Sequence, residues 1–154
     1  MNVQKDYEEL FALLNREKVK YLIVGAHAVG FYGQPRYTGD IDIFFDSSLV
    51  NGKRILCALE RFGFGKLGIT VDDLIAPGAI MQLGYPPVRI DFINMIDGVS
   101  FENAWRNCSK GRYGKQPVNF ISRKDLIKNK KASGRQRDLF DLELLGYKKR
   151  NRKQ

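Results

Sequence analysis

Six consecutive residues beginning at Asp40 alternate between carboxylates and large apolar side chains, in the order Asp-Ile-Asp-Ile-Phe-Phe. A two-residue period is typical of a half-buried β-strand, so Ile41, Ile43 and Phe45 are expected to face a core. Asp40 and Asp42 then share the opposite face, with α-carbons roughly 6 to 7 Å apart because a strand rises about 3.3 Å per residue. The pattern therefore predicts a strand that presents two neighbouring carboxylates.

A second stretch, residues 88–93, repeats this alternation. Its apolar residues form one face, which is expected to meet the core, whereas Arg89 and Asp91 share the other face. If this strand lies beside the first, either parallel or antiparallel, Asp91 joins Asp40 and Asp42 in a cluster of three carboxylates. An isolated Asp-x-Asp pair is often only a solvated strand face, but a third acid favours a site for Mg²⁺ or Mn²⁺.

Between the first apolar run and the Asp-x-Asp pair lies a predicted anion-binding turn. Residues 21–24 predict a buried strand that meets Gly25, and residues 26–29 predict the opening of a short helix. Strand, tight turn and helix start together favour phosphate, because free backbone N–H groups and the positive end of the helix dipole point beyond the strand. The following loop carries Arg36 and Thr38, which are placed to approach an anion near the carboxylates.

The rest of the pattern completes an α+β fold of α/β-like character. It predicts helices at 7–14, 48–62 and 101–105, strands at 79–83 and 118–121, a loop at 107–117, and two closing helices at 123–133 and 135–145. The last helix is expected to bury Leu139, Leu142 and Leu145. The predicted architecture is a small mixed β-sheet with helices that flank it on one side. A pair of helices ends the chain.

Composition narrows the class of protein. The chain has 154 residues and 44% hydrophobic content, which suits one domain, predicted over 1–147. Cys57 and Cys108 are isolated, so their spacing favours neither a zinc site nor a disulfide framework. The N-terminus lacks a signal-peptide layout, and the longest near-apolar run, 21–33, is too short to span a bilayer. We expect a soluble, cytoplasmic protein with no membrane partner.

The chain carries a formal net charge of +9, and residues 148–154 contribute five positive charges and no negative ones. A basic tail of this kind is typically solvated and disordered, with contact to nucleic acid as the second interpretation. The basic balance favours RNA as a partner, while a partner protein's hydroxyl or a small molecule stays open as an acceptor. The pattern carries no information on the oligomeric state.

The order of these features supports a family resemblance. A strand ends in Gly25-Ala26, a spacer of thirteen residues follows, Asp-Ile-Asp occupies 40–42, and a third acid stands at Asp91. In this order the chain resembles the nucleotidyltransferase superfamily related to DNA polymerase beta, in its minimal form. One departure is Ala26, which stands where that family has Gly or Ser, so that a hydroxyl is missing.

The closing segment, 130–141, is similar to the end of a bacterial subgroup that includes abortive-infection type II toxins. The resemblance implies that Asp40 and Asp42 hold two Mg²⁺ or Mn²⁺ ions that bridge an NTP. It implies that Asp91 binds the catalytic ion and helps to deprotonate an acceptor hydroxyl, so that a nucleoside monophosphate is transferred and pyrophosphate leaves. It further implies nucleotide contacts, at the phosphates, from Gly25, Ala26, His27 and Lys130.

Other classes of protein also use Asp-x-Asp. A haloacid-dehalogenase phosphatase needs Thr or Val on a loop shortly after the motif, whereas this motif continues into the apolar residues 43–45. A metal-dependent glycosyltransferase normally needs a longer chain. The alternative from a different class is a catalytically silent nucleotide-binding or toxin–antitoxin interaction module that keeps the same fold.

Overall fold

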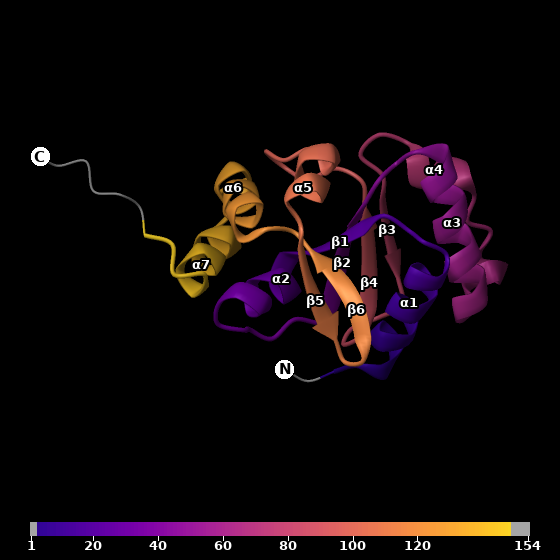
Figure 1. The fold of residues 1–154 in the computed structure, drawn as a ribbon, viewed down its shortest axis with the longest axis horizontal. Helices are drawn as coiled ribbons and strands as arrows, with labels where there is room; N and C mark the ends of the chain where they lie inside the picture. Colours follow the sequence, from indigo (N-terminus) through magenta and orange to yellow (C-terminus); the bar gives the residue numbers. More distant parts are fainter. Residues whose placement is uncertain (1–2, 149–154) are drawn as a thin grey trace, which may run out of the picture.

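The computed structural model describes residues 3–148, which form a six-stranded mixed sheet with seven α-helices (Figure 1). The predicted α+β fold is confirmed, including the C-terminal helical pair. Within the described residues, no helix combines the length and the apolar character that crossing a bilayer requires. The predicted basic tail lies outside this range except for Lys148.

The order of the strands across the sheet differs from their order along the chain. Across the sheet the strands are β3 (Ile80–Leu83), β4 (Arg89–Ile93), β2 (Asp40–Phe45), β1 (Tyr21–Val24), β6 (Gln116–Phe120) and β5 (Ser109–Tyr113). The helices are α1 (Lys5–Arg16), α2 (Gly25–Tyr32), α3 (Leu49–Leu59), α4 (Val71–Ile75), α5 (Phe101–Asn107), α6 (Arg123–Ser133) and α7 (Gln136–Leu144). A π-helical turn, η1 (Glu60–Phe64), and a 3₁₀ turn, η2 (Gly65–Leu67), follow α3.

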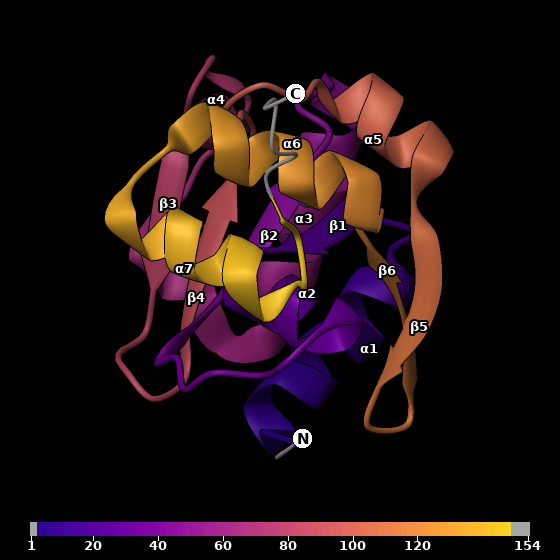
Figure 2. The same ribbon diagram turned by 90° about the vertical axis from the view of Figure 1, so that its left-hand side faces the viewer.

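Helices cover both faces of the sheet, so the expectation of helices on one side is wrong (Figures 1 and 2). One face carries α1, α3 and α4, whereas α6 and α7 lie across the other. The physical reason is visible in β1, whose four apolar residues are all buried and therefore need cover on both sides. On the face of the carboxylates, Phe44 is also buried, and its ring lies 5.1 Å from that of Phe101 on α5.

The face of β2 opposite the carboxylates belongs to the hydrophobic core. Ile41, Ile43 and Phe45 are buried there, as their alternation predicts. Helix α1 packs its apolar stripe into the same core, with Phe11 and Leu14 fully buried, because residues three apart share one helix face. This packing holds β2 in one orientation, with Asp40 and Asp42 facing away from the core.

Strands β2 and β4 are parallel and pair in register, with Asp40 beside Arg89 and Asp42 beside Asp91. The sequence left parallel and antiparallel pairing open, and the structure is parallel. Since register partners project to the same face of a sheet, all four charged side chains lie on one surface. On its other side β2 is antiparallel to β1, which places Val24 beside Asp42 and brings the end of β1 to the carboxylates.

The prediction of a loop at 107–117 is wrong, because this segment contains β5 and the start of β6. The two strands form an antiparallel hairpin at the edge of the sheet. The sequence of β5 is largely polar, since an edge strand is held by backbone hydrogen bonds and its side chains can remain solvated. Gly114, with a φ of 59°, makes the turn between the strands.

The last helix buries two of the three leucines predicted for its inner face, and the prediction is wrong for Leu139. Leu139 is 54% exposed, whereas Asp138 and Asp141 are fully buried; the other two leucines of the predicted stripe are buried as expected. The carboxylates turn inward because Lys130 of α6 pairs with both of them. An ionic contact between α6 and α7 therefore replaces part of the leucine stripe.

Candidate functional site

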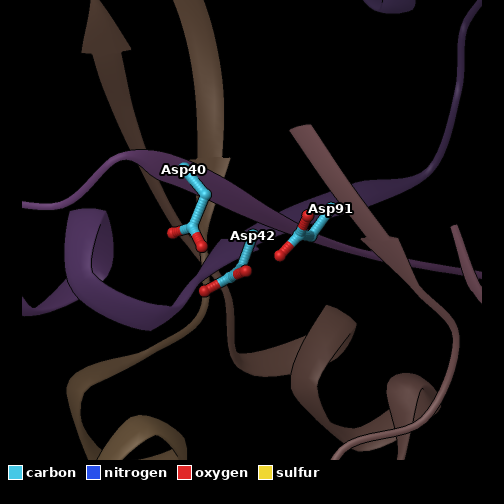
Figure 3. A group of neighbouring side chains, drawn as sticks. All are labelled: Asp40, Asp42 and Asp91. Atoms are coloured by element: carbon cyan, nitrogen blue, oxygen red, sulfur yellow. The ribbon is translucent and has the colours of Figure 1, made fainter. Parts of the chain in front are cut away.

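Three carboxylates meet on the face of the sheet that α6 and α7 cover (Figure 3). Asp40 and Asp42 come from β2 and Asp91 comes from β4, and each offers one carboxylate oxygen such that all three oxygens lie within 4.8 Å of one another. The in-register pairing of the two strands produces this convergence. The structure thus brings together the three acids that the alternation singled out.

The three acids repel one another, and Asp42 shows the effect most. Burial, followed by the charges of Asp40 and Asp91, raises the pKa of Asp42 to about 7 from an ordinary value of 3.8. A cation between the carboxylates would lower this pKa, because it stabilises the ionised form. The electrostatics of the cluster therefore favour a bound positive charge.

A cavity of about 520 Å³ opens over these carboxylates, and residues of the sheet, of α6 and of α7 line it. Asp40, Asp42 and Asp91 contribute to its floor. Its lining also includes five basic side chains, contributed by β4, α6, α7 and two loops: Arg36, Arg89, Lys130, Arg135 and Arg137. Acids and bases together can hold a metal ion and an anionic ligand in the same space.

The turn between β1 and α2 forms one side of the cavity, where Gly25 and Ala26 both belong to the lining. Gly25 has a φ of 68°, and a Cβ added to it would collide with the Asp42 carboxylate. Glycine is therefore required on both conformational and steric grounds. This close approach of backbone to carboxylate places the start of α2 beside the acid cluster, as the strand–turn–helix pattern predicts.

His27 does not reach this cavity. Its ring packs against Tyr7 of α1 at 5.8 Å and against Tyr113 of β5 at 6.1 Å, both measured between ring centroids. Burial lowers the pKa of His27, so the ring is kept neutral. Successive residues of a helix point in directions about 100° apart, which explains how Ala26 lines the cavity while His27 faces the aromatic side chains.

Arg36 and Thr38, both in the loop before β2, line the cavity. The Thr38 hydroxyl donates a hydrogen bond to Asp40 Oδ1 at 2.9 Å, which fixes one oxygen of that carboxylate. Arg36 makes a forked contact with Asp141 of α7, through Nε at 2.7 Å and Nη2 at 3.2 Å. Arg36 thereby ties the loop to the helix that covers the cavity.

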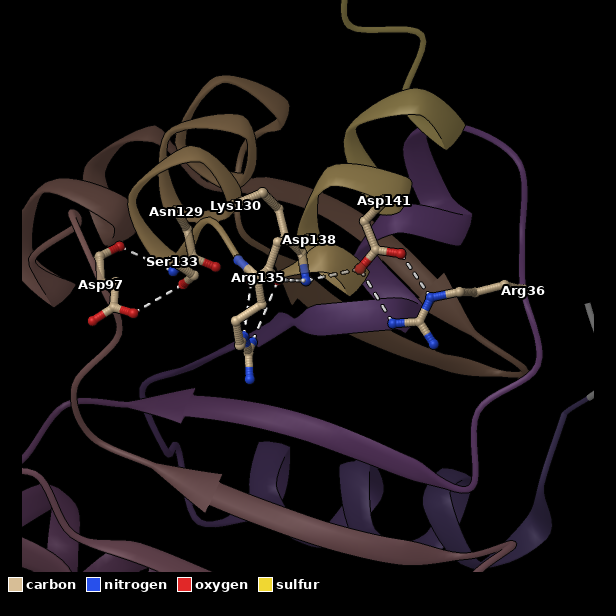
Figure 4. Close-up of polar contacts among 8 residues, drawn as sticks. All are labelled: Arg36, Asp97, Asn129, Lys130, Ser133, Arg135, Asp138 and Asp141. Atoms are coloured by element: carbon tan, nitrogen blue, oxygen red, sulfur yellow. Dashed lines mark hydrogen bonds and ion pairs between the residues drawn. The ribbon is translucent and has the colours of Figure 1, made fainter.

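Lys130 lies in a chain of alternating charges at the α6–α7 junction (Figure 4). Its Nζ is 2.9 Å from Asp141 and 3.2 Å from Asp138, and the whole residue is only 5% exposed. Arg135 continues the chain, since its Nε donates to Asp138 at 2.8 Å. Two buried carboxylates therefore neutralise Lys130, although the side chain still borders the cavity.

Three basic residues of the cavity lining had no role in the sequence prediction: Arg89, Arg135 and Arg137. Arg89 shares a strand face with Asp91, and this spacing was the available signal for its place among the carboxylates. Arg135 and Arg137 follow the turn at Gly134, and only the folding of α7 against α6 brings them over the sheet. Basic residues at a helix start carry no such information by themselves.

Comparisons with known proteins do not identify a family. No protein-family model matches the chain, and the search of curated proteins yields no match. The geometry of the carboxylates and of the cavity is therefore the basis for the function proposed below.

We predict that the stability of the metal-free protein depends on the ionisation of Asp42. Because the folded pKa is raised, unfolding releases the proton, and the free energy of unfolding falls as pH rises from 3.8 to about 7. Below this window Asp42 is protonated in both states and its contribution is complete. Denaturation in EDTA should show this fall in the parent protein and a smaller one in Asp42→Asn, whereas parallel pH curves would contradict it.

We also predict that Asp141→Ala lowers the free energy of unfolding by about 3 kcal/mol, because it leaves Arg36 unpaired and Lys130 with one carboxylate fewer. Glu143→Ala is the matched control, since Glu143 is an exposed acid on the same helix and should change stability by less than about 0.5 kcal/mol. Urea denaturation measures both. Equal effects of the two variants would show that the ionic chain does not hold α7.

Proposed function

We propose that this protein is a metal-dependent nucleotidyltransferase, a minimal member of the superfamily related to DNA polymerase beta. It would transfer a nucleoside monophosphate from an NTP to a hydroxyl group and release pyrophosphate. The observation that carries the proposal is the group Asp40, Asp42 and Asp91, whose oxygens converge within 4.8 Å at the floor of a cavity lined by basic side chains. The glycine turn beside Asp42 adds support.

The residues fit one or two Mg²⁺ or Mn²⁺ ions. Hard divalent cations prefer oxygen ligands, and the three carboxylates supply them at the point where burial and the two neighbouring carboxylates raise the pKa of Asp42. When bound, such ions neutralise the phosphates of the NTP and the charge that develops during transfer. Thr38 holds one Asp40 oxygen at 2.9 Å, which orients that carboxylate.

The rest of the cavity suits a triphosphate. Within the described residues, Arg137 borders the cavity without an ion-pair partner, and the Arg135 side chain is 62% exposed although it contacts Asp138. These two guanidinium groups are better placed to receive phosphate than Lys130, whose charge two carboxylates already offset. Gly25 lets the backbone of the turn lie directly against the Asp42 carboxylate at the cavity edge, because it has no Cβ that would collide with that group.

The chemistry requires an acceptor oxygen to attack the α-phosphorus while the bond to pyrophosphate breaks. The hydroxyl proton passes to a carboxylate, for which we propose Asp91, since it lies deepest of the three at 6% exposed. The net charge of +9 favours RNA as the source of the hydroxyl, with a partner protein as the competing source. Both give the same transfer step.

The test is to incubate the protein with each labelled NTP, Mg²⁺ or Mn²⁺, and the RNA and protein of a bacterial lysate. One fraction should become labelled, and pyrophosphate should be released. No label and no pyrophosphate with any NTP would contradict transfer and favour the silent binding module. A labelled RNA fraction and a labelled protein fraction identify the two acceptor classes.

We predict that Asp40→Asn and Asp91→Asn each reduce transfer on the order of a hundredfold or more, because each removes a negative ligand or the proton acceptor. Asp72→Asn is the matched control, since it removes the same charge from an exposed position on α4 outside the cavity. Circular dichroism should show all three variants folded. Transfer by Asp91→Asn at the rate of the control would rule out the proposed role of Asp91.

A further inference from the structure

Arg89 is the basic side chain closest to the carboxylate cluster, and it bridges two of its members. Its Nη2 donates to Asp40 Oδ2 at 2.6 Å and to Asp91 Oδ2 at 2.9 Å, and its Nε donates to Asp91 Oδ1 at 2.9 Å. The contact with Asp91 is a fork, the strongest geometry for a guanidinium and a carboxylate. Asp42 is left without a contact to Arg89 within the described residues.

The strand register explains this contact. Arg89 lies directly beside Asp40 across the parallel pair β2 and β4, and it shares a strand face with Asp91 two residues later. A long side chain at this position can reach both carboxylates without distortion of the strand. The backbone of Arg89 has a contact of its own that does not involve the guanidinium: the Tyr7 hydroxyl donates a hydrogen bond to the carbonyl oxygen of Arg89 at 2.9 Å.

The guanidinium and a divalent cation compete for the same oxygens. A metal ion held by all three acids needs lone pairs of Asp40 and Asp91 that Arg89 now uses, and two cations at this distance repel each other. The Arg89 side chain is 29% exposed and borders the cavity, so its head can move away while β4 stays in place. Four rotatable bonds separate that head from the strand.

We propose that Arg89 is a displaceable internal cation: its guanidinium holds Asp40 and Asp91 together in the absence of metal, and a divalent ion binds by expelling it into the cavity. The inference rests on the metal-dependent function proposed above. Once expelled, the guanidinium joins the other basic groups of the cavity lining and can receive phosphate oxygens. Metal and triphosphate then favour the same arrangement of Arg89, so each should increase the affinity for the other.

The first test is calorimetry with Mn²⁺ alone on the full chain. Arg89→Gln should bind Mn²⁺ about tenfold more tightly than the parent protein, because no bridge has to be broken. Arg106→Gln removes the same charge from an exposed position on α5 outside the cavity and should change the affinity less than about twofold. Arg89→Lys keeps the charge but loses the fork, so it should also bind more tightly than the parent.

The second test measures the contact of Arg89 in the parent protein itself, and a variant serves only to assign the signal. In nuclear magnetic resonance spectra of the parent protein, the Arg89 Nε–H should give a protected signal, since it donates to Asp91. Its assignment follows from its loss in the spectrum of Arg89→Lys. Addition of diamagnetic Mg²⁺ should remove that protection, an effect that a purely structural ion pair would not show.

The outcomes separate the two proposals. If neither the parent protein nor Arg89→Gln binds Mn²⁺, the metal-dependent function fails, and the displacement of Arg89 fails with it. If both bind Mn²⁺ equally well and the Arg89 Nε–H signal persists in Mg²⁺, the metal site stands and displacement is overturned. Tighter binding by Arg89→Gln together with loss of the signal supports displacement.

Discussion

The contact of like charges between β2 and β4 is the constraint on which the site depends. Asp42 and Asp91 are register partners on neighbouring parallel strands, and Asp40 lies on the same face. A shift of one residue in either strand would turn its apolar side chains out of the core. Burial of Ile41 and Ile43 therefore keeps the carboxylates together although they repel one another.

Basic side chains offset the repulsion between the carboxylates at two distances from the cluster. Arg89 lies within the cluster and contacts two of its members directly. The pair α6 and α7 forms a positive cover at a greater distance, with Arg135 and Arg137 facing the cavity. The cover is itself anchored by buried ions, because Lys130 and two aspartates of α7 satisfy each other between the helices.

The basic side chains around the cavity fall into two groups, which differ in whether a buried carboxylate pairs with them. Cations that meet buried carboxylates, such as Lys130 and Arg36, hold the closing helices and the loop before β2 in position. Cations at the cavity surface, such as Arg137, keep their charge available for an anion. The difference follows from desolvation, since a buried charge must be paired whereas a half-exposed one can be solvated until a ligand arrives.

The local features of the site could be predicted from the amino-acid sequence alone. Alternation is a short-range property, so the strand with Asp40 and Asp42, the strand with Asp91 and the turn at Gly25 could all be predicted from neighbouring residues. Helices with a clear apolar stripe or cap could be predicted for the same reason. At the start of α6, for example, the Ser122 side chain accepts a hydrogen bond from the Asp125 N–H.

Which of these features meet depends on contacts between distant parts of the chain. Parallel pairing of β2 and β4 and the bridge from Arg89 depend on contacts between residues 49 positions apart in the chain. The inward turn of Asp138 and the neutralisation of Lys130 depend on how α7 packs against α6, and a leucine pattern gives no sign of it. His27 faces Tyr113 instead of the cavity because a side chain's neighbours are set by long-range packing, which local periodicity does not encode.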